Sequence, residues 1–236
     1  MDPKINIHLG DCMEAMKGMP DNAYDLAIVD PEYGIGQDGR IDRPHEAIQK
    51  NGSKMKVRSN NHASKKWDDK PPPPEYFKEL FRVSKNQIIW GGNYFSGILP
   101  PSMGWIVWDK VNGESDYSDC ELAFTSFDRA LRKVVFMWRG MMQGKSITEG
   151  HIMQGNKKLN EKRIHPTQKP VALYKWLLKN YAKEGDKILD THGGSMSIAI
   201  ACHDMKFDLD LWEIDEEYCN YGLKRFNQHI SQTQLF

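Results

Sequence analysis

The stretch YDLAIVDPEYGIG places an acid, a tyrosine and two glycines directly after an apolar segment. Leu26, Ile28 and Val29 predict a buried strand, so Asp30 lies at its carboxyl end, where open α/β sheets bind their ligands. The two glycines allow the chain to turn closely around whatever is bound there. Asp30 is therefore the first candidate for chemistry in this sequence.

A second candidate site lies near the carboxyl end of the chain. DKILDTHGGSMSIAIAC is typical of a strand, a glycine turn and a helix, with Asp190 ending the strand and Gly193, Gly194 and Ser195 forming the turn. FDLDLWEIDEEY adds a strand that ends in Glu213, where an acid can accept both hydroxyls of a ribose. Either acid alone is more often a solvated strand tip, but the pair favours a nucleoside-cofactor cradle. The spaced G-x-G-x-x-G is lacking, which disfavours a nicotinamide cofactor.

The elements that must position these residues alternate at both ends of the chain, which predicts an α/β fold with one doubly wound, mostly parallel sheet of seven or eight strands. The predicted strands are Ile5–Leu9, Asp25–Val29, Gln87–Trp90, Trp105–Trp108, Leu122–Thr125, Val134–Trp138, Lys187–Leu189 and Phe207–Trp212. The predicted helices are Cys12–Lys17, Pro74–Val83, Pro170–Ala182, Ser195–His203 and Glu216–Gln228.

Composition limits the class of protein. A chain of 236 residues suits a single domain, 1–236, and no stretch approaches the roughly 18 apolar residues of a membrane span. The charged N-terminus has no signal-peptide core, so we expect a soluble, cytoplasmic protein without membrane contact. The four cysteines are dispersed, which argues against a zinc ribbon or a disulfide framework, and we assign no metal.

Two polar segments, 34–73 and 140–166, interrupt the alternation and coincide with excess positive charge. Gly34–Lys66 holds eight Lys and Arg against three acids, and Arg139–Lys169 holds seven against two, although the whole chain is neutral. Long loops of this kind are usually functional or disordered, and basic ones suit a polyanion. Two solvated loops remain an equally good interpretation of the charge alone.

Seven motifs together resemble a known family, the S-adenosylmethionine-dependent DNA amino-methyltransferases of the Asp-Pro-Pro-Tyr type. Their order, with the Asp-Pro-x-Tyr element before the glycine turn, is similar to the permuted β group. The resemblance covers nearly the whole chain and implies a Rossmann-like methyltransferase fold. The motifs are HLGDC, DPEYGIG, IIWGGNYF, WIVWDK, HPTQKP, ILDTHGGS and WEIDEEY.

The resemblance implies direct methyl transfer from S-adenosyl-L-methionine to the N6 amine of an adenine flipped out of double-stranded DNA. Asp30 and the Pro31 carbonyl would accept the two protons of the amine, whose lone pair is otherwise delocalised into the ring. Tyr33 would stack on the flipped base. Glu32 replaces the second proline of the family and adds a charge near a polyanion.

The same resemblance assigns the cofactor contacts. Asp11 and the Cys12 backbone would receive the cofactor's adenine edge, although a helix cap explains Asp11 equally well. A second group would meet the methionine moiety of the cofactor, with the lysine facing the methionine carboxylate: His165, Thr167 and Lys169. The turn and strand-end residues would hold the rest: Asp190, Gly193, Gly194, Ser195 and Glu213.

Two further departures from the family pattern lie beside this cradle. Thr191 and His192 replace the usual Pro-Phe, which removes an apolar wall beside the cofactor. Met196 occupies a position where glycine is frequent, which could crowd the helix N-terminus. Tryptophans of WGGNYF and WIVWDK could shape the base pocket or belong to the core.

The expected partners depend on the resemblance and on the charge and position of the first basic segment, which directly follows the Asp30 turn. We expect contacts to DNA from the first basic segment, through Arg40, Arg43, Lys54, Lys56 and Arg58. A homodimer and a cognate restriction endonuclease remain open as partners, in a bacterial or phage setting. The alternatives to adenine N6 methylation are cytosine N4 methylation and a DNA-binding relative that has lost turnover.

Overall fold

The computed structural model describes residues 2–36, 45–48, 54–57, 67–113, 118–139 and 141–233, with only the backbone for 45–48 and 54–57. The chain forms two compact units. The larger unit comprises Met1–Pro31 and Pro72–Phe236, and the smaller unit is Glu32–Pro71.

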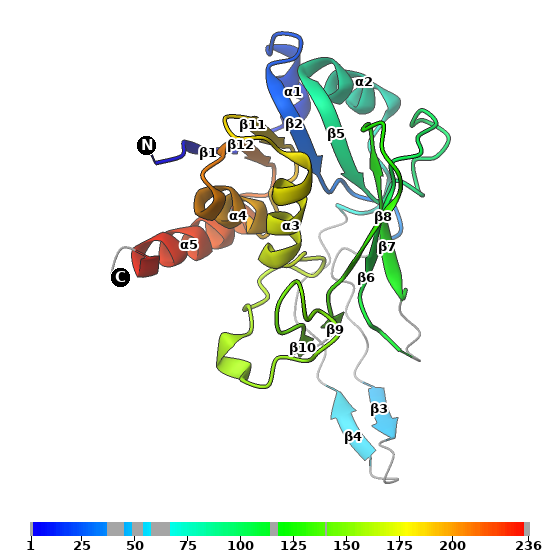
Figure 1. Ribbon diagram of the computed structural model, residues 1–236, viewed down its shortest axis with the longest axis vertical. Coiled ribbons are helices and arrows are strands. Elements are labelled where there is room, and N and C mark those ends of the chain that lie inside the picture. Colours follow the sequence, from blue (N-terminus) through cyan, green and yellow to red (C-terminus); the bar gives the residue numbers. More distant parts are fainter. Residues whose placement is uncertain are drawn as a thin grey trace. The chain divides into compact units, whose positions relative to one another are not determined.

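The larger unit is built on an eight-stranded sheet in the order β1-β12-β11-β2-β5-β7-β6-β8 (Figure 1). The five strands from β1 to β5 in this order are all parallel, β7 is antiparallel to both its neighbours, and β6 is parallel to β8. The predicted mostly parallel α/β sheet is therefore confirmed. The strand bounds are β1 Ile5–Leu9, β2 Tyr24–Val29, β5 Ser84–Trp90, β6 Ile106–Asp109, β7 Cys120–Thr125, β8 Arg132–Val135, β11 Lys187–Asp190 and β12 Asp208–Glu213.

The helices fall into two packed groups. Helix α1 (Cys12–Lys17) packs against α2 (Pro74–Val83), which lies on β5. Helix α3 (Val171–Tyr181) packs against α4 (Ser197–Met205), and α4 contacts α5 (Glu216–Thr233). None of the helices within the described part of the chain is long and apolar enough to cross a membrane.

The core is centred on β2 and β5. Ile28 and Val29 of β2 and Ile88, Ile89 and Trp90 of β5 have no exposed surface. Continuous apolar runs of this kind are typical of parallel strands covered on both faces. Because β2 is fixed on both faces and by two neighbours, the residue that follows it has a well-defined position.

Several predicted boundaries need correction. Val134–Trp138 is not one strand, because β8 ends at Val135: the Phe136 N–H completes the pairing with the Asp109 carbonyl of β6, and the Met137 N–H donates to Gly150 instead. The chain then forms β9 (Trp138–Arg139), which pairs with β10 (Met142–Gln143). The segment 140–166 also contains the short 3-10 helix η1 (Lys157–Leu159), which the polar sequence did not indicate.

Two predicted helices begin later than expected. The helix predicted from Ser195 begins at Ser197, because Met196 adopts a left-handed conformation with φ of 56°. The helix predicted from Pro170 begins at Val171, with Pro170 in an extended conformation before it. The last helix continues to Thr233, five residues beyond the predicted Gln228.

The smaller unit has almost the bounds of the predicted first insertion. Its β3 (His45–Ile48) and β4 (Lys54–Val57) form an antiparallel pair. The buried Asp68 accepts the backbone N–H groups of Tyr33 and Gly34 at 2.8 Å each. Gly34 has φ of 72°, and a side chain there would meet Pro71, so this turn requires glycine.

Candidate active site

The candidate site residues gather at the carboxyl edge of the parallel strands. Asp30 follows β2, Asp190 ends β11, and Glu213 ends β12 opposite Leu9 of β1. Since β11 lies between β2 and β12, the three carboxylates follow one another along this edge. The structure therefore brings together the two candidate sites that the sequence presented separately.

The reversed direction of β7 brings a further acid to the same edge. Because β7 is antiparallel to β5 and β6, its first residues lie where those strands end. Glu121, the second residue of β7, pairs in register with Trp108 near the end of β6. Glu121 is not among the site residues predicted from the sequence, because nothing in the sequence indicates that this strand is reversed.

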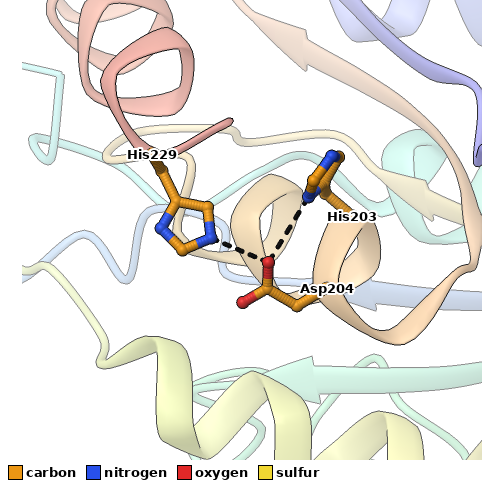
Figure 2. A group of neighbouring side chains, drawn as sticks. All are labelled: His203, Asp204 and His229. Atoms are coloured by element: carbon orange, nitrogen blue, oxygen red, sulfur yellow. Dashed lines mark hydrogen bonds and ion pairs between the residues drawn. The ribbon is translucent and has the colours of Figure 1, made fainter. Parts of the chain in front are cut away.

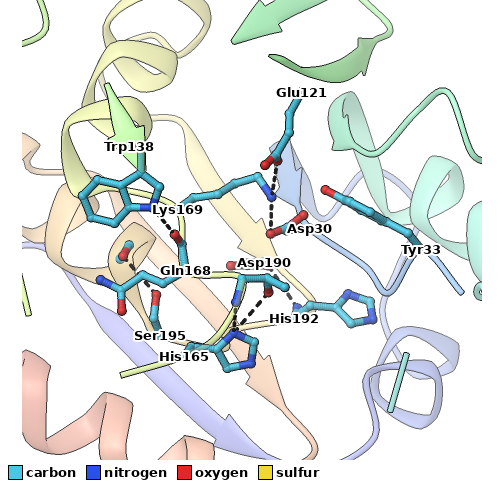
Figure 3. Close-up of polar contacts among 12 residues, drawn as sticks. Asp30, Tyr33, Glu121, Trp138, His165, Gln168, Lys169, Asp190, His192 and Ser195 are labelled. Atoms are coloured by element: carbon cyan, nitrogen blue, oxygen red, sulfur yellow. Dashed lines mark hydrogen bonds and ion pairs between the residues drawn. The ribbon is translucent and has the colours of Figure 1, made fainter. Parts of the chain in front are cut away.

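Lys169 contacts Asp30, which is not the contact that the family resemblance implied. Its Nζ atom lies 2.5 Å from Asp30 Oδ2 and 3.2 Å from Glu121 Oε2 (Figure 3). The lysine side chain is only 3% exposed, so its charge depends on these two carboxylates. Its expected contact with a methionine carboxylate stays a prediction.

The charges around Lys169 alternate along a short series of side chains. Lys110 Nζ donates to Glu121 at 3.1 Å, so Glu121 lies between two ammonium groups. Burial alone lowers the pKa of a lysine, but Asp30 and Glu121 more than offset this and hold the pKa of Lys169 above its ordinary value. Burial raises the pKa of Glu121, but Lys169 and Lys110 hold it below the ordinary value overall. Both groups are therefore charged at neutral pH.

The acid at the end of β12 is held by backbone groups instead. Glu213 accepts the N–H of Gly194 at 2.7 Å and that of Asp215 at 2.8 Å, one on each carboxylate oxygen. A side chain on Gly193 would clash with Leu211, and Gly194 has φ of 48°. The backbone of Gly194 therefore favours glycine, a side chain at Gly193 would displace the buried Leu211, and the turn fixes the Glu213 carboxylate at its edge.

Asp190 lies between these two acids on the sheet edge and is almost completely buried. Its Oδ1 accepts the backbone N–H of His192 at 3.0 Å. Burial raises the pKa of Asp190 to about 7, because the charged form is poorly solvated there. This carboxyl group is therefore part protonated near neutral pH.

The departures at Thr191 and His192 form a polar network. Thr191 is buried, and its hydroxyl lies 2.7 Å from the Tyr76 hydroxyl and 2.9 Å from His192 Nδ1. The Tyr76 and His192 rings make an edge contact at 5.4 Å between centroids. Helix α2 thus supplies a hydrogen-bonded wall where the family pattern has an apolar one.

The Met196 side chain lies between α4 and α5, and the expected crowding of the helix N-terminus stays a prediction. The side chain is fully buried, and it lies so close to Gly222 of α5 that a Cβ at 222 would require the methionine side chain to shift. Its left-handed backbone is a conformation that glycine adopts readily and other residues rarely do. Met196 therefore combines backbone strain with packing between α4 and α5.

The remaining predicted cofactor residues lie in two places. The His165 ring makes an edge contact with Tyr218 at 4.3 Å and lies 3.9 Å from where a side chain on Gly194 would begin, so it faces the glycine turn. Thr167 bonds His165 through its hydroxyl. Asp11 caps α1 by accepting the N–H of Met13 at 2.7 Å, and Cys12 is the first residue of that helix.

Ser195 reveals a further contact that the sequence did not indicate. Its carbonyl accepts a hydrogen bond from Arg225 at 2.7 Å, and Arg225 also pairs with Glu161 at 3.0 Å. The other Glu161 oxygen accepts the N–H of Val171 at 2.9 Å. These bonds join the glycine turn, α5 and the end of the second insertion.

The predicted DNA-contacting side chains cannot be placed. Arg40, Arg43 and Arg58 lie outside the described residues, and only the backbone of Lys54 and Lys56 is described, in β4. In the second basic segment, three lysines are exposed on or near η1: Lys157, Lys158 and Lys162. Arg163 lies 4.4 Å over the Trp138 ring, and Lys145 pairs with Glu149.

A separate cluster joins three helices away from the sheet edge. Asp204 Oδ1 lies 2.7 Å from His229 Nε2 and 3.4 Å from His203 Nδ1 (Figure 2). Among the residues that the structure describes, this is the group whose ligand atoms could meet at a metal ion. The Lys175 ammonium lies 2.6 Å from Asp204 Oδ2 and already supplies a positive charge. We therefore assign the cluster a structural role between α3, α4 and α5.

Comparisons with known proteins agree with this geometry. A family model described as DNA methylase matches residues 107–224, half of the chain. The chain is 25% identical over 252 residues to Type II methyltransferase M.HpaI of Haemophilus parainfluenzae, covering 94% of this chain and 74% of that protein. It is 22% identical over 248 residues to Type II methyltransferase M2.MboI of Moraxella bovis, covering 85% and 79%.

Solved structures share the fold. The M1.HpyAVI–SAM complex superposes with a TM-score of 0.55 at 19% identity, covering 94% of this chain and 99% of that one. The PvuII DNA methyltransferase, described as cytosine-N4-specific, superposes with a TM-score of 0.53 at 13% identity, covering 95% and 89%.

Proposed function

The chain belongs to the DNA methylases of the N6/N4 amino-methyltransferase family, and from this premise we propose that it is a DNA adenine N6-methyltransferase that uses S-adenosyl-L-methionine. The substrate is double-stranded DNA, as the names of its relatives suggest. The observation that carries the proposal is the position of Asp30, an acid at the carboxyl end of the central strand β2, beside a buried ammonium group.

The residues at the glycine turn fit S-adenosylmethionine. A Cβ at Gly194 would lie 3.9 Å from the His165 ring, so glycine puts no side chain into the space between the turn and this ring. Glu213 presents its carboxylate beside that space, and a carboxylate with two bonded oxygens still has acceptor capacity for ribose hydroxyls. A bound cofactor of this kind would supply an electrophilic methyl group on a sulfonium sulfur.

Asp30 acts on the amine that receives the methyl group. The exocyclic amine of adenine is a weak nucleophile, because its lone pair is delocalised into the ring. Hydrogen bonds from its two protons to the Asp30 carboxylate and the Pro31 carbonyl favour a pyramidal nitrogen and stabilise its developing positive charge. Tyr33, three residues after Asp30 in the chain, stacks on the extruded base.

The choice of adenine depends on position 30. Asp rather than Ser at this position favours adenine by analogy with the family. Cytosine N4 methylation is the second candidate, because a solved structure of similar fold is described as cytosine-N4-specific. We also propose that segments 34–73 and 140–166 contact DNA as insertions of a single methyltransferase domain.

Nucleoside analysis tests the proposal. DNA from a methylation-free host is incubated with the protein and labelled S-adenosylmethionine, digested to nucleosides and analysed by mass spectrometry. We expect the label in N6-methyladenine. Label in N4-methylcytosine would instead identify a cytosine N4-methyltransferase. DNA that stays unlabelled at high protein concentration would indicate a DNA-binding relative that has lost turnover.

A further inference from the structure

Lys169 connects Asp30 to a second carboxylate that has no role in the proposed function so far. Its ammonium lies 2.5 Å from Asp30 and 3.2 Å from Glu121, and Glu121 is paired with Lys110 on its other side. We propose that Glu121 is a positioning residue that holds the Lys169 ammonium when Asp30 binds the target amine. This inference rests on the proposed function, because it assigns that role to Asp30.

The need for such a residue follows from competition at Asp30. The target amine becomes positively charged as it attacks the methyl group, and the Asp30 carboxylate stabilises that charge. An ammonium group on the same carboxylate weakens this stabilisation, because its positive charge partly neutralises the carboxylate and repels the charge that develops on the amine. Lys169 must therefore transfer its main interaction to another acceptor during the reaction.

Burial limits where Lys169 can go. The side chain is 3% exposed, so solvent cannot replace the carboxylate that it leaves, and an unpaired buried ammonium is strongly disfavoured. Because Glu121 is already 3.2 Å from the Lys169 ammonium, a small movement of the lysine stem makes Glu121 the principal partner of Lys169. Lys169 keeps its proton in this movement, so hydrogen bonds change and no covalent bond does.

Glu121 is itself well fixed for this role. It lies near the start of β7, where the ladder with β6 pairs it with Trp108. Its side chain is 25% exposed, and that of its second partner Lys110 is 15% exposed. The second ammonium maintains the negative charge of Glu121, since the pKa of this acid is lowered by both lysines.

The first test concerns the ion pair itself and does not require activity. NMR titration of ¹³C-labelled lysine side chains in the full chain measures the pKa of Lys169, assigned with Lys169→Arg. We expect Glu121→Gln to lower this pKa, because one of the two carboxylates that raise it is lost. Asp109→Asn, which breaks the neighbouring Lys133 pair, is the matched control and leaves it unchanged. An unaltered Lys169 pKa in Glu121→Gln overturns the proposal.

The second test separates charge from shape. At saturating DNA and cofactor, Glu121→Gln should lower kcat by about 10- to 100-fold, with little change in the KM for DNA or in cofactor affinity. Glu121→Asp keeps the charge on a shorter stem and should recover part of kcat. If Gln, the better match in shape, is as active as Asp or more active, the role of Glu121 is packing and the proposal fails.

The control is the wild-type chain in the same assay. If the wild-type chain methylates no DNA, the proposed function is refuted, and with it the role of Glu121 in the reaction. An active wild type together with an equally active Glu121→Gln removes only the inference about Glu121. The two failures are therefore distinguishable.

Discussion

The ends of β2 and β12 each present a carboxylate at the same edge of the sheet, but they hold it in different ways. Asp30 is bonded by the side chain of Lys169, which is 139 residues away in the chain. Glu213 is bonded by two backbone N–H groups, from Gly194 and Asp215. One carboxylate depends on a flexible partner and the other on the backbone around it.

This difference indicates a division of work. A lysine stem has four rotatable bonds, so its contact with Asp30 can change while a substrate binds or reacts. The two N–H groups on Glu213 are backbone groups, one in the glycine turn and one directly after β12, so no side-chain rotation can withdraw them. We therefore expect the Asp30 side of the edge to determine the rate of methyl transfer and the Glu213 side to determine cofactor affinity.

The largest effect should come from Asp30→Ala. Loss of one preorganised acceptor for the developing charge typically lowers the rate by on the order of 10²–10³, about 3–4 kcal/mol. Cofactor affinity should remain nearly unchanged, because Glu213 and the glycine turn are untouched. Single-turnover methylation and calorimetric titration with S-adenosylmethionine measure the two quantities. Turnover close to that of the wild type would remove Asp30 from the reaction.

Asp190, on the strand between the two acids, should affect stability through its charge. Burial raises its pKa from an ordinary value near 4 to about 7 in the folded chain. The stability that the protonated acid contributes is thus fully present below pH 4 and is lost as the pH rises through 7. Asp190→Asn removes the charge and keeps an acceptor for the His192 N–H.

We therefore expect Asp190→Asn to be more stable than the wild type at pH 8, by up to about 4 kcal/mol, and to show a flatter dependence on pH. Urea unfolding between pH 5 and pH 9 without cofactor measures this. A variant that is less stable than the wild type at pH 8 would mean that the Asp190 carboxylate is solvated or paired with a cation.

Glu213→Ala tests the carboxylate at the end of β12, for which we expect an effect on cofactor affinity. It should weaken cofactor binding on the order of 10-fold or more, because charged hydrogen bonds contribute about 1.5–3 kcal/mol each. The rate at saturating cofactor should change less, since ribose contacts contribute similarly to the ground and transition states. Glu213→Gln, which keeps one carbonyl acceptor, is the matched variant. An unchanged dissociation constant in Glu213→Ala would place the ribose site elsewhere.

The smallest effects concern the two basic segments. Neutralising Lys54, Lys56 and Arg58 together should weaken DNA binding and reduce its salt dependence by up to about 0.9 log unit per lost phosphate contact, with cofactor affinity unchanged. The matched variant neutralises the exposed Lys157, Lys158 and Lys162. DNA affinity across a salt series compares them. If only the second variant alters the slope, the second segment supplies the phosphate contacts.

The sheet and its ligand edge could be predicted because they depend on local sequence. Continuous apolar runs indicate buried strands, and a polar residue directly after such a run must lie at the strand end, as Asp30 does. The split after Val135 could not be predicted, because it depends on the bond that the Met137 N–H makes to the distant Gly150 carbonyl. The start of α4 at Ser197 depends on a left-handed residue that carries a side chain, which local propensity disfavours.

The partners within the site were harder to predict than its members. Lys169 was a candidate from its motif, but its contact with Asp30 depends on the direction of a buried side chain between distant segments. Glu121 was missed because its place at the edge follows from the reversal of β7. In the smaller unit, the bonds of Asp68 to the turn at Tyr33 and Gly34 were likewise not predicted, because they span more than thirty residues.

The contact between Met196 and Gly222 has a consequence for how this sequence can change over time. While position 196 carries a long buried side chain, a larger residue at position 222 requires the Met196 side chain to move, because a Cβ there would overlap it. A change from Met196 to glycine would ease the left-handed backbone and open room on α5, after which position 222 could vary. The reverse order would pass through an overpacked intermediate. The two positions are therefore coupled, and a change at 196 before a change at 222 is the order that avoids overpacking.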